Sequence, residues 1–404
     1  MRKAYISIAG LLLCGSMLMA QSPANRTAKT IAADVLAQMP AQQQAEYNKL
    51  IKDLSTTGED GVLQLVNMIN APGKGSNANV DYALSGLTYY VMAKGEETAR
   101  MATAKAYIKA LGMVSERETK AFIIRQLQWL GKDESVDALV PYLKEENLSG
   151  PAARALASIN TPSAGKALLS ALTNHVGTAK TQKDVIMAIS EAQVDGSESA
   201  LKALLSSSSD PFLLKEVLYG LSRVGSKASL ADLAAAAAKA NYTLDKSCAN
   251  EAYIALIKRI AKQGDALTAG NEAKALMKNA TKANALQSRE AALQILCSLA
   301  KDKEAIKLVT DAMKDTDMKY RNAALTYASD FANQALYIDL LKTMAKAKPA
   351  VKVDILNWFG RESKRASQRD MVKNLEVRFD LTANQLIMIS PIRSIFVLKR
   401  IRSF

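Results

Sequence analysis

The residues of this chain that could carry chemistry are few and lie far apart in the sequence. Its single histidine, His175, lies in the segment TNHVGT, which links two apolar stretches and holds no acid or nucleophile. A lone histidine of this kind is more often solvated than catalytic. Cys248 and Cys297 are widely separated, and together with one histidine they do not make a zinc-binding pattern. We therefore expect no metal site and no cofactor, and we expect both cysteines to fill small gaps between helices.

Acidic pairs and phosphate-binding motifs give no better evidence for an active site. Glu96-Glu97 and Glu145-Glu146 fall at the edges of predicted helices, where negative charge favours the first turn or faces solvent. A glycosidase holds two carboxylates several ångströms apart across a cleft, and adjacency in sequence does not supply that geometry. Neither G-x-x-x-x-G-K-[ST] nor G-x-G-x-x-G occurs. The sequence predicts a protein that is not an enzyme.

Five lysines remain as candidates for a functional surface. Each follows the first apolar residue of a predicted helix by one or two positions, an offset that points away from the buried face. Stacked helices would align them into a basic row along one flank. The alternative is that lysine is a solvated residue with good helix propensity. The predicted binding residues are Lys105, Lys166, Lys202, Lys274 and Lys307.

The elements that would position these lysines show one recurring pattern of apolar residues. Positions i, i+3, i+4 and i+7 are apolar, which places one stripe along a helix. One helical pair cannot cover its own stripe, so neighbouring pairs must stack. The mean step between equivalent stripes is about 34 residues, within the range of helical repeats. The stripes of the second helices begin at Val62, Ala104, Val136, Ala164, Leu201, Leu230, Ala273, Ala305 and Tyr337.

The residues at the predicted helix boundaries are ones that begin or end helices. The first helix of each pair has the same kind of apolar stripe as the second helix. Thr161-Pro162 and Asp210-Pro211 each place a capping side chain before a proline at the first helical position. Leu130-Gly131 ends another helix. A tenth pair is expected near 351–359 and 369–379. Among the predicted first-helix stripes are Val185/Ala188/Ile189/Ala192, Leu214/Val217/Leu218/Leu221 and Tyr253/Leu256/Ile257/Ile260.

Composition agrees with this pattern. The chain has 404 residues, 49% hydrophobic but only 5% aromatic, which is typical of helices packed through small side chains. A chain of this length exceeds the usual single core, a limit that stacked repeats avoid because each touches only its neighbours. The predicted fold is all-α, an α-solenoid of about ten stacked helical hairpins.

Three segments carry a resemblance to a known family. LGKDESVDALVPYL, INTPSAGKALLSAL and VGSKASLADLAAAA each cross from one helix into the next. They resemble the HEAT and HEAT-like repeats of the armadillo-type superhelix over roughly residues 45–380. The resemblance implies a superhelical fold whose inner surface binds partners. The chain is also similar to the N-terminal part of exported bacterial proteins whose repeats precede a 3-keto-disaccharide hydrolase-like domain. That β-sandwich domain would need alternating strands, which this sequence lacks.

The two ends differ from the repeats. Residues 1–20 combine a basic start with a short apolar stretch ending at Ala20, which predicts a secretory signal peptide. An uncleaved anchor helix is the alternative, and lipoprotein anchoring at Cys14 ranks below cleavage after Ala20. Residues 21–44 are a predicted lead-in segment, followed by the repeats over 45–380. Residues 381–404 are an irregular basic and apolar tail, either a truncated or frame-shifted end or a segment that contacts a membrane or partner.

These features favour a binding protein outside the cytoplasm. We expect an exported, periplasmic or secreted, non-catalytic scaffold that binds a protein or glycan partner on an extended surface. The alternative is a spacer or binding module of a larger secreted carbohydrate-processing hydrolase whose catalytic domain is absent. Nucleic-acid binding has only the net charge of +14 in its favour, and export with few stacking aromatics counts against it. No apolar run after Ala20 is long enough to cross a membrane.

Overall fold

The computed structural model describes residues 26–93 and 97–362, in which helices are joined by turns and no β-strand occurs. They form twenty α-helices and three short 3-10 segments. The predicted all-α class is therefore confirmed for this part of the chain. The predicted signal peptide with Cys14, the tail at 381–404, Glu96 and the second helix of the tenth pair lie outside the described residues.

The chain divides into two compact units, residues 1–164 and 165–404, and each is described by itself. In the first unit α1, α3 and α5 pack in succession, and α2, α4 and α6 form a second succession that continues to α8. Helices of the two successions also contact each other, as α3 contacts α4 and α5 contacts α6. The helices are α1 (Ala28–Ala37), α2 (Gln44–Ser55), α3 (Gly58–Asn67), α4 (Ala78–Ala93), α5 (Glu97–Met113), α6 (Arg117–Leu130), α7 (Val136–Leu139) and α8 (Ser149–Ile159), with 3-10 segments η2 (Asp133–Ser135) and η3 (Val140–Lys144).

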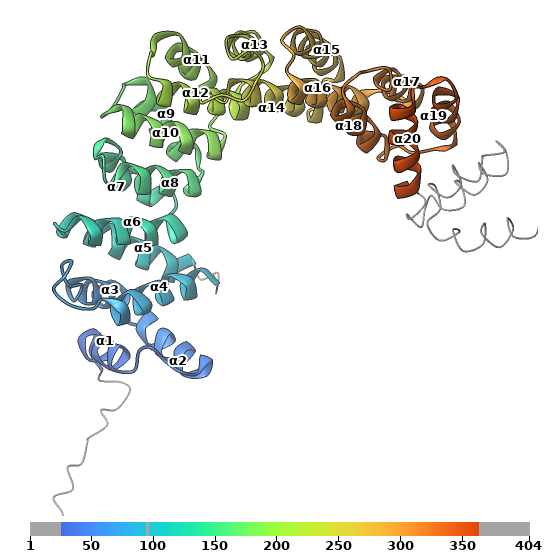
Figure 1. The fold of residues 1–404 in the computed structure, drawn as a ribbon. Coiled ribbons are helices and arrows are strands. Elements are labelled where there is room, and N and C mark those ends of the chain that lie inside the picture. The colour runs from blue at the N-terminus through green and yellow to red at the C-terminus, as the bar shows by residue number, and fades with distance from the viewer. Residues whose placement is uncertain (1–25, 94–96, 363–404) are drawn as a thin grey trace, which may run out of the picture. The chain divides into compact units, whose positions relative to one another are not determined.

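The second unit is built in two layers (Figure 1). The even-numbered helices pack in succession from α10 to α20, and each odd-numbered helix from α11 onward packs against the even-numbered one that follows it. The division between the units falls inside α9. The helices are α9 (Pro162–Thr173), α10 (Ala179–Ala192), α11 (Ser197–Ser207), α12 (Pro211–Val224), α13 (Leu230–Lys239), α14 (Ala249–Lys262), α15 (Ala266–Lys282), α16 (Leu286–Leu299), α17 (Asp302–Ala312), α18 (Met318–Ala328), α19 (Gln334–Lys346) and α20 (Pro349–Glu362), with η4 (Lys227–Ser229).

The predicted apolar stripes form the core where the helical period is undisturbed. In α14, the stripe that opens at Tyr253 and ends at Ile260 is buried at all four positions. In α12, Leu218 is 3% exposed. Both predicted caps are confirmed, because Asp210 accepts from the amide of Phe212 at 2.9 Å and Thr161 accepts from that of Ala164 at 3.4 Å. Each cap satisfies an amide that the first helical turn leaves without a partner.

Three expectations about local structure are wrong. The predicted lead-in segment contains α1, whose Ile31 and Val35 are buried, so helical packing begins before residue 45. The stripe at Val136 is broken at Pro141, where the chain turns into the 3-10 segment η3 and Val140 is 37% exposed. Proline has no N–H and cannot continue the α-helical ladder, so the last turn tightens. In α12, Leu214 is half-buried rather than buried.

The two tryptophans of the chain have opposite environments. Trp358 of α20 is fully buried against Tyr337 and Phe359, with ring centroids about 5.4 Å apart, and its indole N–H donates to Ser329 at 2.9 Å. Trp129 near the end of α6 is 67% exposed. In the described part of the chain, no helix has the length and apolar character needed to cross a membrane.

Candidate functional site

All five predicted lysines lie on odd-numbered helices. Lys105, on α5, is exposed in the first unit. In the second unit Lys166, Lys274 and Lys307 are exposed, on α9, α15 and α17, whereas Lys202 on α11 is half-buried. The offsets from the stripe residues therefore place four of the five side chains in solvent, as the helical period requires.

The charge of this surface in the second unit is partly neutralised. Lys202 forms an ion pair with Asp232 of α13 at 3.0 Å and donates to the Ala228 carbonyl at 2.9 Å. Asp232 occupies the position on α13 where a continued row would need a cation. Lys307 pairs with Asp311 one turn further along α17 at 2.6 Å. Exposed lysines paired in this way stabilise the fold by less than about 1 kcal/mol and leave little charge for a partner.

The other candidate residues from the sequence do not come together. His175 is exposed in the turn after α9 and has φ +48°. Glu145 and Glu146 are exposed beyond η3. Within residues 26–93 and 97–362, no group of three His, Cys, Asp or Glu side chains is placed to hold a metal ion.

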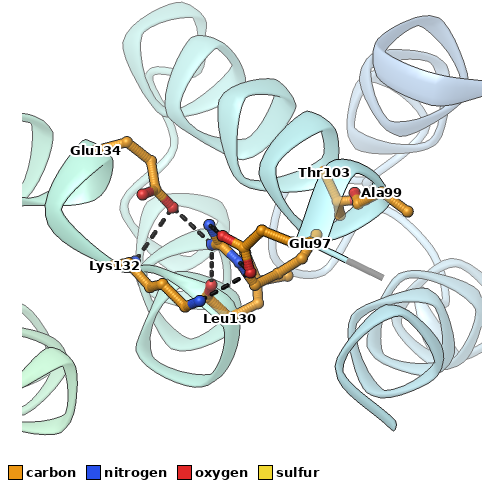
Figure 2. A network of polar contacts seen from close by, with 7 residues as sticks. Glu97, Ala99, Thr103, Leu130, Lys132 and Glu134 are labelled. Carbon is orange, nitrogen blue, oxygen red and sulfur yellow. Dashed lines mark hydrogen bonds and ion pairs between the residues drawn. The ribbon is translucent and has the colours of Figure 1, made fainter. Parts of the chain in front are cut away.

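The first unit contains one polar network that the sequence did not predict, centred on Arg100 of α5 (Figure 2). Arg100 is 6% exposed, and its guanidinium donates to Glu97 at 2.7 Å and to the Leu130 carbonyl at 2.6 Å. It also donates to Glu134 of η2 at 2.6 Å, while Lys132 donates to Glu97 at 2.8 Å. The network joins α5 to the end of α6 and to the turn that follows it.

The electrostatics of this network indicate a structural role. Hydrogen bonds from Arg100, and then from Lys132, lower the pKa of Glu97 to about 2. Burial raises the pKa of Glu134, but the bond from Arg100 and backbone amides outweigh burial and lower it overall. Carboxylates held ionised in this way are poor general acids or bases at neutral pH. The only signal in the sequence was position, because Arg100 precedes the stripe residue Ala104 by one turn and so shares its buried face.

A cavity of about 560 Å³ opens on the even-numbered helices of the second unit, where α14, α16 and α18 lie next to each other. Its apolar part is formed by Ile295 and Cys297 of α16, which are 2% and 6% exposed, together with Tyr327 of α18 and Phe331 beyond it. Its polar part consists of side chains that reach solvent. These are Lys258, Lys262, Gln294, Ser298 and Asp330.

The chemistry of this cavity favours binding over catalysis. Lys258 donates to Gln294 at 2.8 Å, so two polar groups are oriented at the opening. Burial raises the pKa of the Cys297 thiol to about 12, which leaves almost no thiolate at neutral pH. Burial also raises the pKa of Tyr327. An apolar and aromatic surface with a few placed polar groups is typical of a small-ligand or side-chain pocket.

Exposed aromatic residues mark the even-numbered helices of the first unit as well. Tyr89 of α4 is 74% exposed and Trp129 of α6 is 67% exposed, and α4 packs against α6. Tyr82 of α4, 43% exposed, packs against Tyr47 of α2 with the two rings tilted by 49° and their centroids 5.2 Å apart. Large aromatic side chains left in solvent are enriched at recognition surfaces.

Comparison with known proteins adds no family to this description. No family model matches the chain, and no curated protein matches it in sequence. The protein is thus defined by its class, an all-α protein over the described residues. The resemblance to HEAT-like repeats and the one to the repeat region of hydrolase-bearing proteins stay predictions.

Proposed function

We propose that the protein is a non-catalytic scaffold of HEAT-like helical repeats that binds a protein or glycan partner. The repeating contacts within each unit, even-numbered helix to even-numbered helix, support a solenoid of stacked hairpins. In such a solenoid each pair touches only its neighbours, which leaves a long surface open to a partner.

The observation that carries the proposal is the cavity between α14, α16 and α18. Tyr327 and Phe331 offer apolar contact to a sugar ring or to an apolar side chain of a protein. Gln294, Lys258 and Asp330 offer hydrogen bonds at the opening. Binding energy in such a site comes from the apolar area, and the polar groups fix the orientation of the ligand.

Export is part of the same proposal, and it rests on the predicted signal peptide at residues 1–20. It places the partner in the periplasm or outside the cell. The alternative keeps the cavity but makes the chain a spacer or binding module of a larger carbohydrate-processing hydrolase. A longer reading frame in related chains that continues into a catalytic domain would favour this alternative.

A photo-cross-linking experiment in the native cell envelope tests the proposal. A benzophenone amino acid at Gln294, which is exposed at the cavity, should give an adduct of defined mass. The benzophenone amino acid placed instead at Lys282, which is exposed at the end of α15 and outside the cavity lining, should give no adduct. Adducts of equal yield at both positions, or none at Gln294, would contradict binding at this cavity.

The non-catalytic part of the proposal has its own test. The purified chain from Gln21 onward should show no hydrolase activity above background on disaccharides or polysaccharides. Turnover that survives repurification and is abolished by substitution of one carboxylate would overturn it.

A further inference from the structure

A second cavity of the C-terminal unit, about 660 Å³ in volume, lies where the α17–α18 turn meets the α19–α20 turn. It is separate in its lining residues from the cavity described above. Its walls come from the end of α17, the turn after it, the end of α19 and the start of α20. Five cationic side chains and one acidic side chain line it: Lys314, Arg321, Lys342, Lys346, Lys348 and Asp315.

Asp315 and Arg321 already form ion pairs and hydrogen bonds within the wall of the cavity. Asp315 pairs with Arg289 and accepts from the amide of Asp317 at 2.9 Å. Arg321, 4% exposed, pairs with Asp354 at 2.7 Å and donates to the carbonyls of Asp315 and Thr316 at 2.9 Å each. These contacts hold the α17–α18 turn on one side of the cavity.

Two lysines on the opposite side of the cavity, Lys346 and Lys348, come from the α19–α20 turn. Lys346 ends α19 and Lys348 immediately precedes α20, and both are exposed. Across residues 26–93 and 97–362, neither side chain forms an ion pair. Lys314 and Lys342 are also present, each with an aspartate on its own helix or turn, at 2.6 and 3.1 Å. Two unpaired like charges on one cavity wall are relieved by an anion between them.

The backbone adds one donor at the same place. Helix α20 begins at Pro349, and Ala350 and Val351 line the cavity. Pro349 has no N–H, and the amide of Val351 donates to the Lys348 carbonyl at 3.0 Å, so the amide of Ala350 is the donor that this helix start offers. The positive end of the helix dipole favours an anion there. Thr316 adds a hydroxyl group from the α17–α18 turn. Lysine ammonium groups, a backbone amide and a hydroxyl group together suit a tetrahedral oxyanion.

We propose that this cavity binds a phosphate or sulfate group. The volume exceeds the space of the bare ion, so the site has room for the molecule that bears the group. This inference rests on the second cavity alone and is independent of the proposed scaffold function, so either can fail without the other.

Calorimetric titration of the full mature chain at constant ionic strength tests the inference. Inorganic phosphate, sulfate and glycerol 3-phosphate should each bind saturably, whereas sodium chloride and acetate should not. The double variant Lys346→Gln/Lys348→Gln should weaken phosphate binding by about tenfold or more, since charge-assisted bonds are lost. Tighter binding of the ester than of inorganic phosphate would support a phosphorylated ligand, and equal binding would support the free ion.

The matched control is Lys301→Gln/Lys303→Gln, which removes two exposed lysines at the same spacing around the start of α17, away from the cavity lining. It should change phosphate affinity by less than about twofold. Equal weakening by both double variants would show only a general charge effect and overturn the site. So would saturable binding of none of the three anions.

A labelling experiment on the unmodified chain covers the case in which a variant does not fold. Phosphate should protect Lys346 and Lys348 from an amine-reactive reagent, while Lys301 and Lys303 react as before. Protection of neither Lys346 nor Lys348 at saturating phosphate would refute the assignment.

Discussion

Replacement of Arg100 by methionine tests whether one buried guanidinium holds α5 to the end of α6. Methionine is unbranched and adaptable, so it retains most of the packing while it removes the charge and every donor. The variant loses the bonds to Glu97, to Glu134 and to the Leu130 carbonyl, all between 2.6 and 3.1 Å. What remains is a stack of helices with an unsatisfied carbonyl at the end of α6.

The expected loss of unfolding free energy depends on how exposed each hydrogen-bond partner of Arg100 is. A carbonyl left without its donor in a buried place costs about 1–3 kcal/mol. Glu97 has a side chain 54% exposed, so solvent screens its pair with Arg100 and the pair contributes little to the loss. The side chain of Glu134 is only 22% exposed, so water replaces its lost ion pair with Arg100 less fully than it does for Glu97. Relief of the buried cation offsets part of this sum, and we expect a loss of about 2–4 kcal/mol in unfolding free energy.

The same variant should change how stability depends on pH. The pKa of Glu97 in the folded chain is about 2, below its value of about 4.3 in an unfolded chain. A lowered folded pKa gives stability that is present above about pH 4.3 and is lost as pH falls toward 2. The difference in stability between the wild type and Arg100→Met should therefore narrow over that window.

Urea unfolding and amide hydrogen exchange of α5 and α6 would measure both effects. Arg117→Met is the matched control, because Arg117 pairs with Glu118 at 2.8 Å with both side chains 59% exposed. It should cost less than about 0.5 kcal/mol and leave the pH dependence unchanged. Two outcomes would refute the structural role assigned to Arg100. One is an equal loss of unfolding free energy in both variants. The other is a difference in stability between wild type and Arg100→Met that does not narrow as the pH falls.

Two further predictions concern the second unit. Leu218→Ala empties a buried position of α12 and should cost about 2–5 kcal/mol in urea melts, whereas Phe212→Ala, at a position 75% exposed, should cost less than about 0.5 kcal/mol; similar losses would contradict the burial pattern. Thiol counting in denaturant without reductant should return two for the chain from Gln21 onward, because Cys248 and Cys297 are both free. In the native chain Cys297, whose pKa burial raises to about 12, should react far more slowly than when unfolded, and equal rates would contradict its burial.

The helices were predictable because each stripe is a local property of the sequence. Tyr253 and Ile260 are seven residues apart, and a helix brings them to one face whatever surrounds it. The expectation failed where a local rule competed with the period, as at Pro141, which ended α7 after four residues and exposed Val140. Helix α1 was missed because its three buried residues, one small and two β-branched, make only a short stripe.

The Arg100 network was not predictable from spacing, because its partner Glu134 lies 34 residues away. Such a contact depends on how the end of α6 sits beside α5, which a helical period does not encode. The cavity between α14, α16 and α18 has the same origin, since its lining comes from three helices and from the turn after α18. Each of its residues looks ordinary in its own helix, and only the packing brings them together.

Helical periodicity predicts which lysines are exposed, but it does not predict which of them form ion pairs. An offset from the stripe says that Lys202 and Lys307 point outward, but not which charge meets them there. Asp232 on the next odd-numbered helix and Asp311 one turn along α17 each take one of these charges. Lys346 and Lys348 lie at a turn, outside the stripe pattern, and meet no such acid among the described residues. Among the described residues Lys105, Lys166 and Lys274 form no ion pair either, so the lack of a paired acid does not by itself mark a site. Lys346 and Lys348 differ from these three lysines because they line a cavity together with other cationic side chains.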